Sequence, residues 1–161
     1  MESIIAELLK FSEDILEINN SISDDRISIF EKKYNLKWPN DFKKFITKIN
    51  GFSLLGNKVY GFDENITESI ENVYRFEHFE VSYPQPLCLV PFCNDGRGNF
   101  YCLDTSKNTE TENCPIVFWV SNYEYTNEDL PEIVNNNFLE WIEEVIIEWT
   151  LEEYNYDGSE K

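Results

Sequence analysis

The residues of this chain that could carry out chemistry are few, since it has one histidine among 161 residues. His78 stands in Phe76-Glu77-His78-Phe79-Glu80, and a lone histidine in such a setting is more typical of a packed or surface residue than of a catalytic base. The sequence contains no G-x-S-x-G, H-E-x-x-H or G-x-x-x-x-G-K-[ST] pattern. The glycines of Asn94-Asp95-Gly96-Arg97-Gly98-Asn99 lack the spacing of a dinucleotide-binding loop. We therefore expect a protein that is not an enzyme.

Metal and redox chemistry are also disfavoured. The cysteines are Cys88, Cys93, Cys102 and Cys114. They form no C-x-x-C pair, and the first three lie in apolar, strand-like segments, where cysteine acts as a small hydrophobe. No secretory signal is visible in the sequence after Met1-Glu2-Ser3. We expect reduced thiols in a cytoplasmic protein with no cofactor and no metal.

Paired carboxylates and aromatic side chains offer a weaker chemical alternative. Among the 31 acidic residues many chance pairs must occur, and only a perturbed pKa in a cleft would single one out. Trp119, Tyr123 and Tyr125 could line a site for a sugar or another small molecule, although packing is the commoner role of such residues. We therefore rank a site for a small molecule below the binding of a protein partner.

The net charge of −18 is the most informative property of the composition. It is concentrated toward the C-terminus, since residues 1–50 carry a net charge of −1, residues 51–123 carry −6 and residues 124–161 carry −11. Such a surface repels phosphate backbones and anionic lipids, and the longest apolar run, Ile116–Val120, is too short to span a membrane. We expect no nucleic acid and no membrane as partner, but a basic protein.

The helices that must position these charges follow from apolar periodicity. The predicted helices run over Glu2–Ile18, from the N-cap Ser23 to Asn35-Leu36-Lys37, from Trp38-Pro39 to Asn50-Gly51, over Ile66–Phe76 and over Phe138–Tyr154. Pro39 suits a first helical position, and Gly51 suits a left-handed residue after a helix. The inner face of the last helix is predicted to comprise Phe138, Trp141, Ile142, Val145 and Trp149.

Strand patterns occupy the middle of the chain. The predicted strands are Lys58–Phe62, Leu87–Cys93, Asn99–Asp104 and Pro115–Ser121, with a loop over Glu77–Pro86. Asp95-Gly96 between two apolar runs indicates a hairpin, so the sheet should be largely antiparallel. We expect a single α+β domain over residues 1–161, with N-terminal helices and a long C-terminal helix packed around the sheet, and a frayed acidic tail over 155–161.

The last predicted helix carries most of the excess negative charge. Its acidic residues are Glu140, Glu143, Glu144, Glu148 and Glu152. Several lie four residues apart without a basic neighbour, an arrangement that slightly destabilises an isolated helix. Two interpretations remain open: a solvated face that keeps the protein soluble, or a surface matched to a positively charged partner.

Several segments in order resemble the SUKH superfamily of Smi/Knr-type proteins. They are Ile27–Ile46 with Trp38-Pro39 and Asp41-Phe42, the following Asn50-Gly51, the run Leu89–Asp104 and the strand Pro115–Trp119. The resemblance spans about 23–149, with Trp38 in place of the usual leucine before Pro39. It implies an α+β fold, and it implies structural roles for Trp38, Pro39, Asn50, Gly51, Asp95, Gly96, Gly98 and Asn99.

Many bacterial members of this superfamily resemble immunity proteins, which bind a cognate toxin and block it, and fungal members act in cell-wall and signalling regulation. The resemblance and the charge together suggest an antitoxin that occludes a basic toxin, such as a nuclease domain, by mimicking nucleic acid. The candidate contact residues are Glu140, Glu143, Glu144, Glu148 and Glu152, joined by Glu124, Glu128 and Asp129. The alternative is a non-catalytic regulatory scaffold of the Smi/Knr type that binds cellular proteins.

Overall fold

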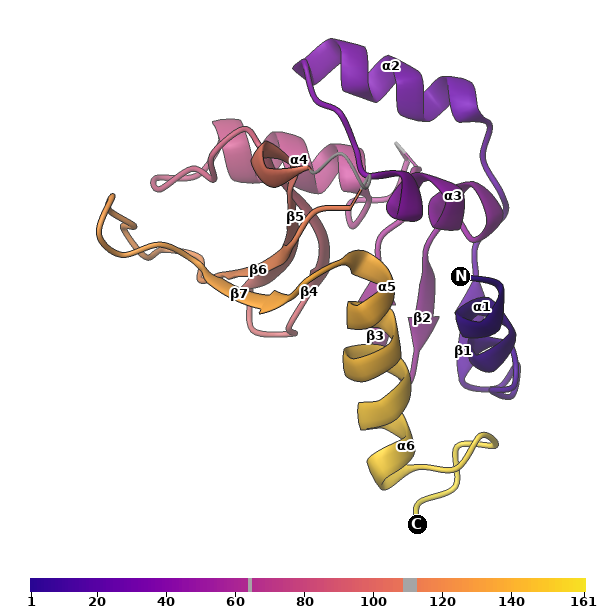
Figure 1. Cartoon of the computed structure of the whole chain (residues 1–161). Coiled ribbons are helices and arrows are strands. Elements are labelled where there is room, and N and C mark those ends of the chain that lie inside the picture. The colour runs from indigo at the N-terminus through magenta and orange to yellow at the C-terminus, as the bar shows by residue number, and fades with distance from the viewer. Residues whose placement is uncertain (64, 109–112) are drawn as a thin grey trace.

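A seven-stranded sheet organises the chain in the computed structural model, which describes residues 1–63, 65–108 and 113–161 (Figure 1). The strands are β1 Leu16–Ile18, β2 Phe52–Leu54, β3 Asn57–Val59, β4 Leu89–Asn94, β5 Phe100–Asp104, β6 Ile116–Trp119 and β7 Glu132–Asn135. They lie side by side in chain order, and all neighbouring pairs are antiparallel. The expected α+β class is confirmed.

The helices surround this sheet, and the longest helical stretch runs down from the end of β7 (Figure 1). They are α1 Glu2–Leu8, α2 Asp24–Tyr34, α3 Asn40–Lys48, α4 Ile70–Phe79, the 3₁₀ turn η1 Thr105–Lys107, α5 Phe138–Trp141, the π-helical segment η2 Ile142–Glu148 and α6 Trp149–Glu153. The last three follow without a break, and we call them the C-terminal helix. This helix was correctly predicted from the sequence.

Aromatic rings join α3 and the C-terminal helix to one face of the sheet. Phe138 meets Phe42, Phe45 and Phe92 at ring-centroid distances of 4.7, 5.2 and 5.3 Å, and all four side chains are fully buried. These near-perpendicular contacts are the geometry that aromatic pairs prefer, and each buried ring adds a large apolar area. The helix that carries the acidic residues is therefore fixed firmly to the sheet.

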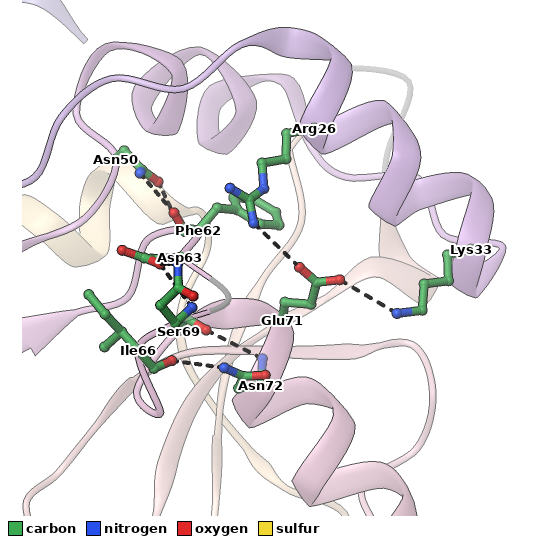
Figure 2. A network of polar contacts seen from close by, with 10 residues as sticks. Arg26, Lys33, Asn50, Phe62, Asp63, Ile66, Ser69, Glu71 and Asn72 are labelled. Atoms are coloured by element: carbon green, nitrogen blue, oxygen red, sulfur yellow. Dashed lines mark hydrogen bonds and ion pairs between the residues drawn. The ribbon is translucent and has the colours of Figure 1, made fainter.

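The end of α3 is fastened to the segment after β3 by a contact that we call the loop joint (Asn50, Gly51, Gly61 and Phe62). The Asn50 side-chain amide donates to the Phe62 carbonyl at 3.1 Å, and the Phe62 amide donates to Asn50 Oδ1 at 2.7 Å (Figure 2). Gly51 has a φ of +76°, and a Cβ on Gly61 would lie 1.9 Å from the Asn50 carbonyl oxygen. Only glycine fits these positions, which gives the Asn50-Gly51 motif a physical reason.

The helix predicted over Glu2–Ile18 is wrong beyond Leu8. The chain turns at Ser12, whose hydroxyl accepts a hydrogen bond from the Asp14 amide at 3.2 Å. Leu16–Ile18 then pairs with β2 as an edge strand. A hydroxyl that bonds its own backbone competes with the helix, and strand pairing overrides the apolar periodicity.

The region between α3 and α4 also differs from the prediction. The strand expected over Lys58–Phe62 is the shorter β3, and its partner β2 was missed. The turn between them uses positive φ values at Leu55 and Gly56, and leucine is an unusual residue for that conformation. The helix expected over Ile66–Phe76 begins later, at the N-cap Ser69, and its last turn replaces the start of the predicted loop.

Smaller differences occur at the ends of elements. Pro39 is the N-cap of α3 and not its first helical residue. Strand β7 was missed because it is a short edge strand with two exposed residues. The tail expected to fray forms a turn in which Tyr154 pairs with Glu160, and the Tyr156 ring contacts Phe11 at 5.0 Å.

Candidate functional site

The carboxylates of two candidate glutamates, Glu140 and Glu144, accept hydrogen bonds from other residues of the chain. Glu140 accepts hydrogen bonds from the Asn136 amide at 2.8 Å and from the Asn136 side chain at 3.0 Å. Glu144 accepts from the Asn135 side chain at 2.7 Å. Asn135 is the last residue of β7, so the Glu144 contact joins the helix to the sheet. Asn136 follows the strand, and the Glu140 contact braces the chain just before the N-cap Asn137. Both carboxylates thus already have hydrogen-bond partners within the fold.

The π-helical segment determines which side chains of the C-terminal helix face outward. Ile146 and Ile147 are both buried, whereas Trp149, predicted on the inner face, is 57% exposed. A π-helix bonds i to i+5 and fits more residues into each turn than an α-helix, so every position after it rotates relative to the α-helical pattern. The prediction for Trp149 is therefore wrong, and its indole stands on the surface.

Trp149 lies among the remaining acidic residues of the helix. We call Glu143, Glu148, Trp149, Glu152 and Glu153 the acidic helix surface; all five are exposed. Glu143 and Glu148 line a shallow groove of about 260 Å³ against α1. Trp149, Glu152 and Glu153 line a groove of about 520 Å³ against the sheet, which also contains Asp95. Tryptophan is one of the residue types enriched in interface hot spots.

The electrostatics of this surface differ from those of the rest of the chain. In the described part of the chain, no ion pair or hydrogen bond engages the carboxylates of Glu143, Glu148 or Glu152. All the ion pairs that the structure describes lie within residues 2–107. The single basic residue after 123, Lys161, donates to the Leu151 carbonyl. The negative charge of the helix is thus not neutralised from within.

The other candidate acids lie on the loop between β6 and β7, away from the acidic helix surface. Figure 1 shows this loop at the end of β7 opposite the C-terminal helix. Glu124 and Glu128 are exposed, and Asp129 accepts a hydrogen bond from the Tyr123 hydroxyl. The structure therefore does not bring Glu124, Glu128 and Asp129 together with the helix.

The aromatic residues near this loop serve packing. The Tyr125 ring lies 4.4 Å from the buried Trp119, and its hydroxyl accepts from the Val120 amide at 3.0 Å. The Tyr123 ring contacts Tyr125 edge-on at 4.8 Å. The rings pack on one another and stabilise the loop.

The motif residues make contacts within the fold. Trp38 is buried and stacks on Phe62 at 5.4 Å. The Asp95 carboxylate accepts from the Arg97 and Asn99 amides and from the Asn99 side chain, while Gly96 and Gly98 supply the positive φ values of the turn. Partial burial acts to raise the pKa of Asp95, but these hydrogen bonds outweigh it and lower that pKa.

His78 and the cysteines are parts of the packed interior. The His78 ring nitrogens face the Tyr74 and Pro86 carbonyls at 2.6 and 3.1 Å, and burial lowers its pKa. Cys114, like Cys93 and Cys102, is buried, and Cys88 is half-buried. Within the described residues, no cluster of three or more side chains could hold a metal ion, and no helix is long and apolar enough to cross a bilayer.

Comparison with known proteins finds one family and one fold. A family model described as SUKH_5, SMI1-KNR4 cell-wall, matches residues 1–148. No curated protein matches. Among the solved structures that match is one described as the crystal structure of a protein from Pseudomonas syringae pv. tomato, with a TM-score of 0.65 and 17% identity, which covers 92% of this chain and 99% of that chain. At this identity the likeness shows the fold alone.

Proposed function

Because the chain belongs to the SUKH family of SMI1-KNR4-type proteins, we propose that it is an immunity protein that binds and occludes a toxin with a basic surface, such as a nuclease domain. Family membership supports a protein of the immunity or Smi/Knr type that works through protein–protein contact. The acidic helix surface is the proposed site of that contact. Inhibition of this kind needs no catalytic group, because a protein that covers the toxin's substrate site already blocks the toxin.

The observation that carries this proposal is the unneutralised charge around an exposed Trp149. A nuclease holds phosphates with basic side chains, so carboxylates on a rigid helix can occupy the same groove in place of phosphates. Complementary charge also accelerates encounter, and an indole at the centre of the contact supplies the apolar area that limits dissociation. The aromatic contacts of Phe138 keep the helix from moving when the partner binds.

Co-expression with candidate toxin domains taken from the genes next to that of this chain tests the proposal. The wild-type chain should protect cells, whereas the double variant Glu148→Lys/Glu152→Lys should protect them poorly while folding normally. The matched control is Glu13→Lys/Glu17→Lys, which makes the same change in net charge at exposed positions outside the C-terminal helix, after α1 and on β1. Equal protection by both variants would remove the helix surface from the proposal.

A regulatory scaffold is the second candidate, favoured by the family's description as cell-wall proteins. Such a protein would bind a cellular partner through its surface and would give no protection against a toxin. If the wild-type chain fails to protect cells in which it is folded and abundant, this second candidate replaces the first.

A further inference from the structure

The largest groove among those described lies between α4 and the sheet, away from the C-terminal helix. It has a volume of about 1010 Å³, and we call it the α4 groove. Its walls include Tyr60, Val73, Phe76, Glu77, Tyr83 and Phe100. Phe100 and Tyr101 point to opposite faces of β5, as successive strand residues do, and Tyr101 packs on Trp141 of the C-terminal helix. The α4 groove and the acidic helix surface therefore lie on opposite faces of the sheet.

A buried carboxylate lines the α4 groove. Glu77 is only 5% exposed, yet no ion pair or hydrogen bond engages its carboxylate in the described part of the chain. Ser121, which also lines the groove, has a buried hydroxyl without a partner. Burial without a partner is costly for a carboxylate, so a largely buried carboxylate that opens into a groove gains from a cationic ligand.

The other charged groups of the α4 groove are already neutralised. Glu68 pairs with Lys58 at 3.1 Å, and Arg75 pairs with Glu80 at 3.3 Å. Among the described charged residues that line the groove, Glu77 is therefore the one without an ion pair. The exposed rings of Phe76 (50%) and Tyr83 (43%) flank the entrance with flat, apolar faces.

From this geometry we infer that the α4 groove receives an arginine side chain of a basic protein partner, with the guanidinium on the Glu77 carboxylate and its plane against the aromatic walls. A guanidinium binds a carboxylate through two parallel hydrogen bonds and stacks on aromatic rings, whereas an ammonium ion does neither as well. Bound arginine would also neutralise the charge that burial disfavours. The inference rests on the proposal that the chain binds a basic protein, but it concerns a different face.

Protonation of Glu77 should make the binding of arginine depend on pH. Burial raises the pKa of Glu77 above its ordinary value of 4.5. The titratable groups near Glu77 are the paired Arg75 and the buried His78 on α4, and Cys102 on β5, whose pKa burial also raises. Since arginine needs the ionised carboxylate, its binding should weaken as the pH falls through the pKa of Glu77.

The test is an NMR titration of the full chain with N-acetylarginine amide, with the neutral isostere N-acetylcitrulline amide and with N-acetyllysine amide. We expect arginine amide to shift the ring signals of Phe76, Tyr83 and Phe100, and to bind at least about tenfold more tightly than citrulline amide. Glu77→Gln should lose this preference, while Glu13→Gln, the same change at an exposed position away from the groove, should keep it.

Three results would overturn the inference: no shifts at the α4 groove, equal binding of arginine and citrulline amides, or lysine amide binding as tightly as arginine amide. The pH titration of the wild-type chain gives a readout that does not depend on a variant folding, and binding unchanged from neutral pH to pH 4.5 would also overturn it. Because the probe is not the toxin, failure here leaves the acidic helix surface standing, and failure of protection leaves this result standing.

Discussion

The α2–α4 region and the C-terminal helix use charged side chains in opposite ways. In the first region, the Glu71 carboxylate forms ion pairs with Arg26 at 3.9 Å and with Lys33 at 3.5 Å. One carboxylate of α4 thus joins two positions of α2 (Figure 2). In the C-terminal helix, Glu143, Glu148 and Glu152 point to solvent without a basic neighbour. The paired charges join elements to one another, whereas the unpaired charges of the C-terminal helix form the surface that we propose binds a partner.

We expect substitutions in one region to change stability and substitutions in the other to change partner binding. Changes at the loop joint or among the paired charges should alter the free energy of unfolding. Changes on the acidic helix surface should alter partner binding and leave unfolding nearly unchanged, because exposed side chains contribute little to stability.

The largest effect is expected at the loop joint. Gly61→Ala places a Cβ 1.9 Å from the Asn50 carbonyl oxygen, so the backbone must move and the Asn50–Phe62 hydrogen bonds must break. We expect a loss of about 3 kcal/mol or more in denaturant unfolding. The control is Gly56→Ala, which meets no atom within 4 Å and should cost only about 1 kcal/mol for its positive φ. Equal losses would refute the steric account of this joint.

The next largest effect is expected at Trp149. Trp149→Ala should weaken binding to the toxin domain by about 2 kcal/mol or more, roughly thirtyfold, with little change in thermal stability. The comparable control is Leu130→Ala, since Leu130 is 67% exposed but lies on the distant loop. A Trp149→Ala protein that binds as well as wild type would show that the indole is not an anchor.

A moderate effect is expected where a glutamate of the helix is engaged by the sheet. Glu144→Ala removes the acceptor of the Asn135 side chain, and it should lower the free energy of unfolding by about 1 kcal/mol. The same change at the exposed Glu148 should leave stability within about 0.5 kcal/mol of wild type. Identical unfolding curves for the two variants would contradict the division of roles among these glutamates.

The smallest effect concerns the pH dependence of Glu77. Its folded pKa is raised, so its contribution to stability is fully present below its ordinary pKa of 4.5 and is lost as the pH rises through the folded value. Glu77→Gln should therefore gain stability relative to wild type as the pH rises from 4.5 toward neutrality. His78 is common to both proteins and cancels in the difference between their melting temperatures. A difference that does not change with pH would refute the burial effect on Glu77.

Much of this comparison could be read from the sequence. The apolar spacing of Phe138, Trp141 and Ile142 located the C-terminal helix, and the concentration of charge in 124–161 identified its acidity. The exposure of Trp149 could not be predicted, because a π-helical segment depends on how Ile146 and Ile147 pack and leaves no simple periodic signal. An unusually dense cluster of glutamates around a tryptophan was the available hint.

Two further features depend on tertiary structure. The β2–β3 hairpin was missed because Leu55 adopts a positive φ, which its residue type does not announce. Glu77 is buried without an ion pair in a groove that the β4–β5 turn helps to form with α4. These two segments are distant in the sequence. Local patterns predict elements, and they say little about which polar side chains will lack partners between those elements.

The unneutralised charge of the C-terminal helix is the surface that we propose binds the toxin. We would measure the association rate and the affinity of the purified chain for candidate toxin domains from neighbouring genes, at low and at high salt. We expect Glu148→Lys/Glu152→Lys to slow association about tenfold or more and to remove much of its salt dependence, while Glu13→Lys/Glu17→Lys binds nearly as wild type. Equal slowing by both pairs, or tight binding that ignores salt, would contradict this proposal.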